Sequence, residues 1–521
     1  MAANFSIDTE CHFCDLADLE GATPMTTLPP TGLDWSELVP HLDAFAGADL
    51  SWRDGKTYAY VYDAGREVED VGTRAFARYL FVNALDPTAF PSALALENEV
   101  VGLAARHLGG GPGAVGTFTS GGTESILCAV KAARDFGRAR GLPAGGGVPQ
   151  IVLPTTAHPA FHKAAWYLGL EVVAVDVDPV TFRADPAAMA AACGPRTLLL
   201  VGSAPSYAHG VVDPIRELGA LAREKGLLLH VDACVGGFLL PYFRRLGAPV
   251  PDFDLSVPGV TSISMDFHKY GFAPKGASVV VYADPALRRA QYFACADWPG
   301  YALVNPAVGS SKSAGPLAAT WAVLQHVGDA GFLDLARRCL EGTRRLVEGV
   351  AALDGLRVLG TPDLCMVALA GEGGVSPFHV VDEMKLRGWF LQAQPSFRGM
   401  PASIHLSLGP ENAERVDELL VDLRASVEAA RGLPTGQLAA VVGQALAGLA
   451  GPPGPEDLGR LLALAGVVDG RLPERMAPIH ELLDALPRPL CAAFLADFMA
   501  GLFTPGQGVP APAPREAAAV G

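Results

Sequence analysis

The chain has 521 residues, of which 50% are hydrophobic, and a formal net charge of −16 at pH 7. This length exceeds what one ordinary hydrophobic core requires, and the composition is globular, so we expect one large unit with smaller parts attached. Because most of the surface would repel phosphate groups, the charge disfavours nucleic acids and anionic membranes as partners.

The N-terminal segment has no basic stretch followed by an apolar core, and no apolar run reaches the roughly 20 residues that a membrane span needs. The nine cysteines are scattered and lie mostly in apolar surroundings, which is typical of reduced thiols in a cytoplasm. Cys11 and Cys14 have no second pair at a suitable spacing, so no metal site is predicted. We expect a cytoplasmic protein without a transmembrane segment.

Along the chain, residues 1–90 are mixed in character, and the apolar spacing of Pro91–His107 predicts a helix. From about 115 to 285, short β-branched runs alternate with amphipathic stretches. This alternation predicts a three-layer α/β/α fold with a mainly parallel sheet. The strands are expected at 151–154, 172–178, 197–203, 227–233, 261–266 and 277–284. Ligands bind beyond the carboxyl ends of such strands, so the residues that follow these runs are the informative ones.

A long helical stretch, Leu317 to Gly349, opens a smaller α+β part, and from Leu433 the composition shifts to Ala, Leu and Gly with helical periodicity. The last stretch is low in complexity. The predicted units are an N-terminal segment (1–90), a large domain (91–314), a small C-terminal domain (315–432), a helical appendage (433–505) and a disordered tail (506–521).

Lys269 is one of only eight lysines and directly follows the strand expected at 261–266. A lysine in that place can lose its solvation, which lowers the pKa of its amine and favours attack on an aldehyde. Arginine cannot replace it, because a guanidinium stays protonated. The competing interpretation is an ordinary surface pair formed by His268 and Lys269.

Three further features follow strands or open a helix. Asp232 is either a solvated strand cap or the carboxylate that keeps the pyridine nitrogen of pyridoxal 5′-phosphate (PLP) protonated. The glycine-containing segment 119–126 is either an ordinary capped helix start or a phosphate cradle at a helix N-terminus. His158 either stacks on a flat ring or has a structural role. Together with Lys269, these features supply every contact that PLP needs.

Six segments then resemble sphingosine-1-phosphate lyase, within the PLP fold-type-I group that also contains the group II amino-acid decarboxylases. The resemblance runs from about Tyr58 to about Leu408. Its motifs are TSGGTESILCAVKAARD (119–135), HPAFHKAAWYLG (158–169), GSAPSYAHGVVDPI (202–215), HVDACVGGFLLP (230–241), VTSISMDFHKYGFAPKGAS (260–278) and ADWPGY (296–301).

The resemblance implies that Lys269 is the Schiff-base lysine, that Asp232 pairs with the pyridine nitrogen and that His158 stacks on the ring. The residues it assigns to the cofactor phosphate are Gly121, Gly122, Thr123 and His268. It also implies a homodimer with shared active sites, in which residues 1–90 contribute to the site and the dimer, and Ser310 in segment 309–315 reaches the partner's cofactor.

Two positions depart from the family pattern. Asp86 stands where the family has a histidine that binds the substrate phosphate. The family's Gly-Ser-Arg-Pro-Gly-Gly is Gly-Ser-Ser-Lys-Ser-Ala at 309–314, where Lys312 roughly keeps the charge but not the bidentate fork of arginine. An ionised Asp86 would repel a phosphate. Tyr62 and Lys275 match positions associated with the substrate phosphate, although Lys275 could instead be a structural loop cation.

The predicted activity is a PLP-dependent lyase reaction at the α-carbon of an amine. A retro-aldol cleavage of an amino alcohol, which is phosphorylated in the family, is the first interpretation. An amino-acid decarboxylase with Lys312 or Arg398 on the carboxylate is the second, and a PLP-binding protein without turnover is a distant third. The proton carriers proposed from motif order are Lys269, Lys275, Tyr207 and His209, and His158 is counted with the catalytic residues. The segment 388–395 either shapes the substrate pocket or is core packing.

Overall fold

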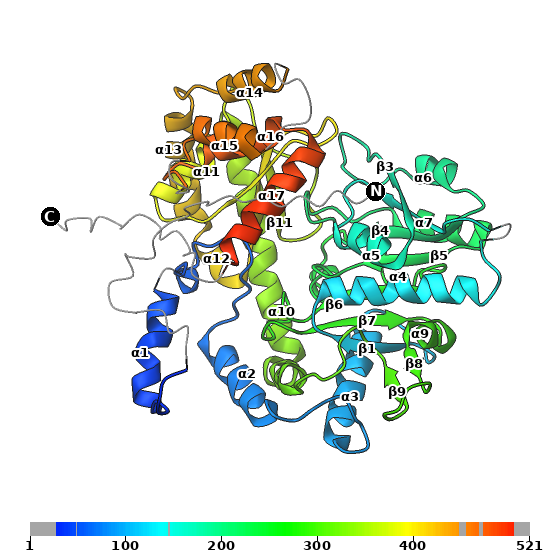
Figure 1. Ribbon diagram of the computed structural model, residues 1–521. Helices are drawn as coiled ribbons and strands as arrows, with labels where there is room; N and C mark the ends of the chain where they lie inside the picture. The colour runs from blue at the N-terminus through cyan, green and yellow to red at the C-terminus, as the bar shows by residue number, and fades with distance from the viewer. Residues whose placement is uncertain (1–27, 48, 144–145, 448–454, 468–471, 505–521) are drawn as a thin grey trace.

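The computed structural model describes residues 28–47, 49–143, 146–447, 455–467 and 472–504 (Figure 1). The Cys11–Cys14 pair and the predicted tail at 506–521 lie outside the described residues. Within the described residues, no helix is long and apolar enough to cross a membrane.

The central sheet has seven strands in the order β1-β7-β6-β5-β4-β2-β3. The strands are β1 (Val115–Thr119), β2 (Gln150–Pro154), β3 (Glu171–Val175), β4 (Thr197–Ser203), β5 (Leu228–Asp232), β6 (Ser262–Asp266) and β7 (Ser278–Tyr282). Every neighbouring pair from β6 to β3 is parallel, whereas β7 runs antiparallel to both β6 and β1. The predicted mainly parallel α/β sheet is confirmed.

Both faces of this sheet are covered, which explains why its strands are apolar without alternation. Ile151 and Leu153 of β2 pack toward one set of helices, and Val152 between them packs toward the other. The first set is α4 (Gly122–Arg138), α5 (Ala160–Leu168) and α9 (Pro285–Gln291). The second set is α3 (Pro91–His107), α6 (Pro186–Ala192), α7 (Ile215–Lys225) and α8 (Leu240–Arg245).

The long helix α10 (Gly315–Ala351) lies between the large sheet and the small domain in Figure 1. A break at Gly328, with φ 62° and ψ 174°, divides it. The small domain has a four-stranded antiparallel sheet in the order β10-β11-β13-β12. Its elements are β10 (Leu356–Val358), β11 (Met366–Gly371), α11 (Pro377–Leu386), β12 (Gln392–Gln394), β13 (Ser403–Ser407), α12 (Pro410–Glu414) and α13 (Val416–Ala430).

The N-terminal part reaches across to the small domain. Thr57 forms a bridge with Phe390, and the carbonyl oxygen of Tyr58 accepts a hydrogen bond from the Ser407 amide. This pairing carries the chain on to Tyr62 beside the large sheet. The N-terminal helices are α1 (Trp35–Ala46), η1 (Trp52–Asp54) and α2 (Arg66–Tyr79).

Two further groups of elements complete the fold. A hairpin of β8 (Phe293–Cys295) and β9 (Leu303–Asn305) follows α9. At the C-terminal end, four helices pack around their own small core, and we call them the C-terminal module. They are α14 (Gln437–Ala447), α15 (Pro455–Leu464), α16 (Ala477–Ala485) and α17 (Arg488–Leu502).

The boundaries of several elements differ from the sequence-based expectation. Strand β3 ends at Val175, three residues earlier than expected. Helix α4 begins at Gly122, so more than half of the glycine-containing segment 119–126 already belongs to the helix. The predicted helix over Leu317–Gly349 is real but interrupted at Gly328.

Candidate active site

The candidate residues follow neighbouring strands at one edge of the large sheet. Asp232 ends β5, where it pairs in register with Ser203 of β4 and Ser264 of β6. Lys269 lies three residues beyond β6, Tyr207 four beyond β4 and His158 four beyond β2. Because the carboxyl ends of parallel strands meet at the same edge, these side chains share one site, as in other open α/β sheets.

The Lys269 ammonium lies 3.0 Å from a carboxylate oxygen of Asp266, which is buried at the end of β6. Burial alone would lower the pKa of Lys269, but the ion pair with Asp266 outweighs it and raises that pKa above its usual value. The expectation that desolvation frees this amine is therefore wrong. The sequence signal that could have corrected it is an acidic residue three positions before the lysine.

The Asp266 carboxylate also lies against the start of α4. Burial would raise its pKa, but Lys269 and His268 hold the pKa of Asp266 below its ordinary value. A Cβ atom added at Gly122 would come within 3.0 Å of this carboxylate and 2.8 Å of the Cys234 sulfur. A Cβ atom at Gly121 would lie 3.6 Å from the His268 ring. The structure thus brings Gly121, Gly122 and His268 together at the N-terminus of α4, where an anion is favoured.

Asp232 is buried and held in one orientation. Its Oδ1 atom accepts hydrogen bonds from the Cys234 amide (3.1 Å) and the Ser264 hydroxyl (3.5 Å). Behind it, His230 lies between the Ser262 and Ser264 hydroxyls at 2.9 and 3.2 Å, and burial lowers the pKa of His230 to about 4. A fixed carboxylate on a strand end suits the pyridine nitrogen of PLP.

His158 is exposed at the same edge, and its Nδ1 atom accepts a hydrogen bond from the Ala160 amide at 3.2 Å. The ring is therefore oriented but not covered by the described chain. A flat cofactor between His158 and Lys269 would be contacted on its face, at its nitrogen by Asp232 and at its phosphate by the start of α4. The residues present fit PLP.

Lys275 lies beside this group. Its ammonium donates to the carbonyl oxygens of Tyr60 (3.1 Å) and His268 (3.3 Å) and lies 5.1 Å from the centre of the Tyr62 ring. Burial and the nearby Lys269 charge lower the pKa of Lys275. The lysine with a lowered pKa in this site is thus Lys275 rather than Lys269.

Tyr207 links the large sheet to the small domain. Its hydroxyl donates to the Gln392 side chain at 2.5 Å, its ring stacks on His405 at 4.2 Å, and burial raises its pKa. His405 is buried with a pKa lowered to about 3 and shares a hydrogen bond of 2.8 Å with the Ser407 hydroxyl. Sequence reasoning missed Gln392, His405 and Ser407, because the pairing of β12 and β13 with this edge is a tertiary property.

Other predicted residues lie apart from Lys269. His209 stacks on Phe182 at 4.1 Å. The exposed Asp86 accepts hydrogen bonds from the amide and hydroxyl of Thr88, the first among the causes that lower its pKa. Lys312 donates to the Phe118 carbonyl at 3.3 Å.

Segment 308–309, next to Ser310, donates its amides to Glu124 at 2.9 and 3.3 Å. In the part of the chain that the structure describes, no hydrogen bond or ion pair joins Asp86, Lys312 or Ser310 to Lys269.

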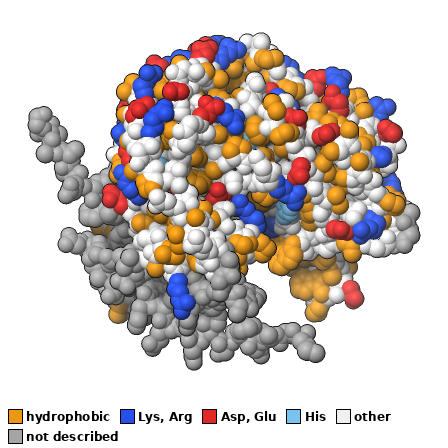
Figure 2. Space-filling model, turned by 90° about the horizontal axis from the view of Figure 1, so that it is seen from above, with side chains coloured by type: hydrophobic (Ala, Val, Ile, Leu, Met, Phe, Trp, Pro, Cys, Tyr) orange, Lys and Arg blue, Asp and Glu red, His pale blue; other side chains and the backbone are white. Residues whose placement is uncertain are grey.

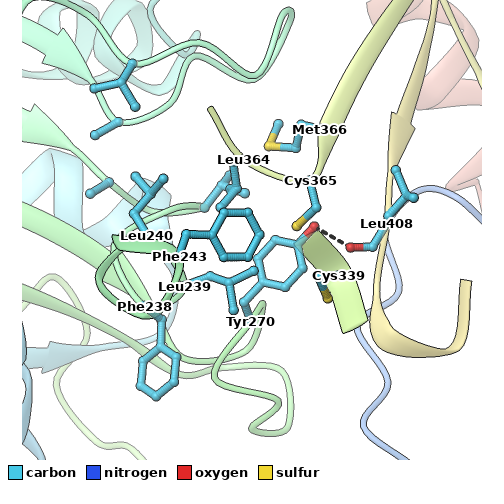
Figure 3. Packing of buried hydrophobic residues seen from close by; sticks show 14 of the residues in the cluster. Phe238, Leu239, Leu240, Phe243, Tyr270, Cys339, Leu364, Cys365, Met366 and Leu408 are labelled. Carbon is cyan, nitrogen blue, oxygen red and sulfur yellow. Dashed lines mark hydrogen bonds between the residues drawn. The ribbon is translucent and has the colours of Figure 1, made fainter. Parts of the chain in front are cut away.

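The residue that follows Lys269 is held in the core. Tyr270, the next residue, is fully buried and donates its hydroxyl to the Leu408 carbonyl at 3.0 Å (Figure 3). Figure 3 shows Phe243 and the thiols of Cys339 and Cys365 packed around that ring. On the outside, Figure 2 shows basic and histidine side chains gathered in a hollow of the surface. Basic and histidine side chains gathered in one hollow suit an anionic ligand.

Comparison with known proteins agrees with this geometry. The model of the "Pyridoxal-dependent decarboxylase conserved domain" matches residues 57–369, and that of the "Pyridoxal-dependent enzyme, C-terminal putative HTH domain" matches 436–501. The sphingosine-1-phosphate lyase of Dictyostelium discoideum is 38% identical over 403 residues, which cover 77% of this chain and 74% of that protein.

Two further comparisons bear on fold and reaction. The structure of the Burkholderia pseudomallei sphingosine-1-phosphate lyase has a TM-score of 0.74 and 35% identity, covering 83% of this chain and 98% of that one. A protein named probable L-tyrosine/L-aspartate decarboxylase from Methanothermobacter thermautotrophicus is 32% identical over 351 residues, which cover 67% of this chain and 91% of that protein.

Proposed function

Because this chain belongs to the pyridoxal-dependent decarboxylase family, as a sphingosine-1-phosphate lyase-like member, we propose that it cleaves the Cα–Cβ bond of a phosphorylated amino alcohol. The chain is a PLP-dependent lyase. The observation that carries the choice of bond and substrate is the 38% identity to a sphingosine-1-phosphate lyase over 77% of the chain.

The proposed reaction breaks the Cα–Cβ bond and removes the proton of the β-hydroxyl group, which leaves an aldehyde. A proton then takes the place of the lost carbon at Cα and gives a phosphorylated amine. PLP, when bound, supplies the electron sink for the pair left at Cα. The chain's own residues must hold the cofactor, orient the amine and move these two protons.

We assign the cofactor contacts as follows. Lys269 would bind the aldehyde carbon, Asp232 would face the pyridine nitrogen and His158 would cover one face of the ring. Gly121, Gly122, Thr123 and His268 would hold the phosphate. The convergence of these side chains at one sheet edge supports this assignment.

The proton carriers follow from the pKa shifts. The lowered pKa of Lys275 makes it a better base than an ordinary lysine, so we assign it the β-hydroxyl proton. Burial raises the pKa of Tyr207, so its hydroxyl stays protonated. Its proton is donated to Gln392, which leaves the Tyr207 oxygen free to accept a hydrogen bond from the substrate. The ring of Tyr62 contacts Lys275, and we assign Tyr62 to the binding of the substrate phosphate.

The test is product identification by mass spectrometry. Purified enzyme with PLP is incubated separately with sphingosine 1-phosphate, sphingosine, L-tyrosine and L-aspartate. An aldehyde and phosphoethanolamine from the first compound alone support the proposal. Release of CO2 from an amino acid without cleavage of the phosphorylated lipid would contradict it.

A second function, amino-acid decarboxylation, is favoured by two observations. The archaeal decarboxylase named above is 32% identical and covered over 91% of its length. Asp86, an exposed carboxylate with a lowered pKa, stands where a phosphate-binding histidine is expected, and a negative charge there disfavours a phosphorylated substrate. The same panel separates the two reactions.

We also propose a homodimer with shared active sites in the cytoplasm. Phe81 is 93% exposed and Tyr301 is 60% exposed. Asn83, two residues after Phe81, forms a bridge with Ser313. Such apolar surface suits burial in a partner, and the adjoining Ser310 would then contribute to the partner's phosphate site. Sedimentation analysis tests the dimer.

All seven cysteines within the described residues have free thiols, which supports a reducing compartment.

A further inference from the structure

The C-terminal module has the wrong charge for a nucleic-acid-binding domain. Residues 436–501 contain four arginines and no lysine against seven carboxylates. A helical domain that reads DNA needs a basic face, because it must neutralise phosphates. The module must therefore serve the enzyme in another way, and its contacts with the rest of the chain indicate which.

The module is fastened to α11 of the small domain. Both carboxylate oxygens of Asp382 accept hydrogen bonds from the start of α16, at 2.8 Å from the Met476 and Ala477 amides. Arg475 forms an ion pair with Glu383 at 2.7 Å. These contacts fix α16 relative to the small-domain sheet, and therefore fix any side chain that α16 presents to its neighbours.

Asp484 is an α16 side chain that contacts the small domain at Ser396, two residues after β12. Its Oδ1 atom accepts hydrogen bonds from both the amide (2.7 Å) and the hydroxyl (2.8 Å) of Ser396. Arg488, at the start of α17, donates to the Ser396 carbonyl and lies 3.5 Å from Asp484. All three polar groups of Ser396 are thus held by the module.

Ser396 opens a tight turn that follows β12. Phe397 and Met400 exchange two backbone hydrogen bonds of 3.0 and 2.9 Å across it. The turn forces Arg398 to φ 45°, a left-handed conformation that is unfavourable for a residue other than glycine. An unfavourable backbone persists only where its surroundings hold it, and the hydrogen bonds from the module are part of those surroundings.

Arg398 reaches from this turn to the edge of the large sheet that carries the active site. Its guanidinium lies 3.0 Å from Asp176, the residue after β3, and the two side chains are 49% and 69% exposed. Together with burial, the Arg398 charge lowers the pKa of His162, which lies one turn beyond His158 on α5. A half-exposed guanidinium with five N–H donors can bind a second anion while it keeps Asp176.

We propose that Asp484 is a positioning residue for substrate binding. It holds Ser396, and through Ser396 it places Arg398 at the rim of the site as the cation that receives the anionic group of the amine substrate. The C-terminal module is thereby a brace for this rim rather than a nucleic-acid-binding domain. This inference rests on the proposed function, because it takes the substrate to be an amine. It applies whether the anionic group of that amine is a phosphate or a carboxylate.

The test compares wild type, Asp484→Ala, Arg398→Ala, the double variant and the control Asp497→Ala, which changes an exposed acid on α17. The probes are sphingosine 1-phosphate, L-tyrosine and sphingosine, an amine without an anionic group. For each, KM and kcat are measured, together with the dissociation constant from the absorbance change of the bound cofactor.

We expect Asp484→Ala to weaken binding of the anionic amine that the enzyme uses by about 5- to 10-fold, the size of one or two lost hydrogen bonds, with kcat nearly unchanged. Binding of sphingosine should stay the same. In the Arg398→Ala background the effect of Asp484→Ala should vanish, because the two act in series. If the variant weakens binding of sphingosine 1-phosphate, the anionic group is a phosphate. If it weakens binding of L-tyrosine, the group is a carboxylate.

Equal weakening for sphingosine, or an undiminished effect in the Arg398→Ala background, would overturn the inference. Should Asp484→Ala fail to fold, Ser396→Ala gives the same readout through the loss of one hydrogen bond, and Asp484→Asn, which keeps an acceptor, should retain most of the affinity. If the wild type converts none of the amines, the proposed function fails, but the dissociation constants still test the brace.

Discussion

Gly122 is the residue on which the cofactor cradle depends most directly. The Gly122→Ala change would place a methyl group 2.8 Å from the Cys234 sulfur and 3.0 Å from the Asp266 carboxylate. Both neighbours are buried, so the start of α4 must shift by a few tenths of an ångström. We expect PLP affinity to fall by about 10-fold, since overpacking of this kind costs roughly 1–3 kcal/mol.

The matched control is Gly121→Ala, whose methyl group would meet only the His268 ring at an ordinary 3.6 Å. Titration of the apoenzyme with PLP, followed by visible absorbance, measures both affinities. Equal affinities for the two variants would show that the cofactor phosphate does not use the first turn of α4.

Asp266 controls the charge of Lys269, and this gives a second prediction. In the apoenzyme the ion pair raises the pKa of Lys269, so little neutral amine is present to react with PLP at pH 7. Asp266→Asn removes the carboxylate and leaves burial, which lowers the pKa of that lysine. We expect the pH at which PLP uptake becomes fast to move downward in this variant.

Stopped-flow absorbance between pH 6 and pH 10 measures that uptake. Asp232→Asn is the control, because it alters the contact with the ring nitrogen and leaves the ion pair of Lys269 intact. An upward movement of the pH profile in Asp266→Asn would show that another group sets the charge of Lys269.

At the scale of elements, the regular apolar runs were predictable and their directions were not. Strand β4 occupies Thr197–Ser203 as expected, because seven buried apolar or small residues in a row suit only a central strand. β7 has the same apolar pattern but runs antiparallel, a property set by the connection between β6 and β7. Strands of three residues, such as β10 and β12, are too short for any periodicity to reveal.

The break in α10 allows a prediction about a single element. At Gly328 the backbone has φ 62° and an added Cβ would meet nothing within 4 Å, so Gly328→Ala changes only the conformational energy. We expect a loss of about 1–2 kcal/mol in the free energy of unfolding. Gly102→Ala within the regular helix α3 should instead stabilise by about 0.5–1 kcal/mol.

Urea denaturation of both variants measures these changes. A larger free energy of unfolding in Gly328→Ala would mean that the break straightens without cost. The left-handed conformation of Gly328 would then not be required for the two halves of α10 to reach the large sheet and the small domain.

At the scale of the whole molecule, the sequence indicated which residues lie at the ends of the strands. It did not indicate which residues from elsewhere in the chain contact them. Asp232, His158 and Lys269 were predictable because each follows an apolar run. The raised pKa of Lys269 and the stack of Tyr207 on His405 were not, because they depend on a buried neighbour and on a strand of the other domain. Site residues from long-range packing need a structure.

Three buried histidines make the free energy of unfolding depend on pH. Burial lowers the pKa of His209 and His230 to about 4 and that of His405 to about 3. The unfolded chain, with histidine pKa values of about 6.5, then binds these protons first. Their contribution to stability is complete above pH 6.5 and is lost as the pH falls toward the folded-state values.

Asp213 acts in the opposite sense, since burial raises its pKa to about 6 and its contribution is complete below the unfolded value of about 3.9. Between pH 6 and pH 4 it therefore offsets about one of the three histidines. From these four groups a net uptake of about two protons on unfolding remains, which corresponds to a slope of about 2–3 kcal/mol per pH unit.

We therefore expect urea midpoints to fall between pH 6.5 and pH 4.5, and the fall to be shallower in His405→Gln, whose side chain stays neutral and can still bond to Ser407. A slope in His405→Gln as steep as in wild type would mean that the buried surroundings of His405 accept the protonated ring. His405 could then carry a proton for the reaction, and its stacking on Tyr207 would acquire a catalytic meaning.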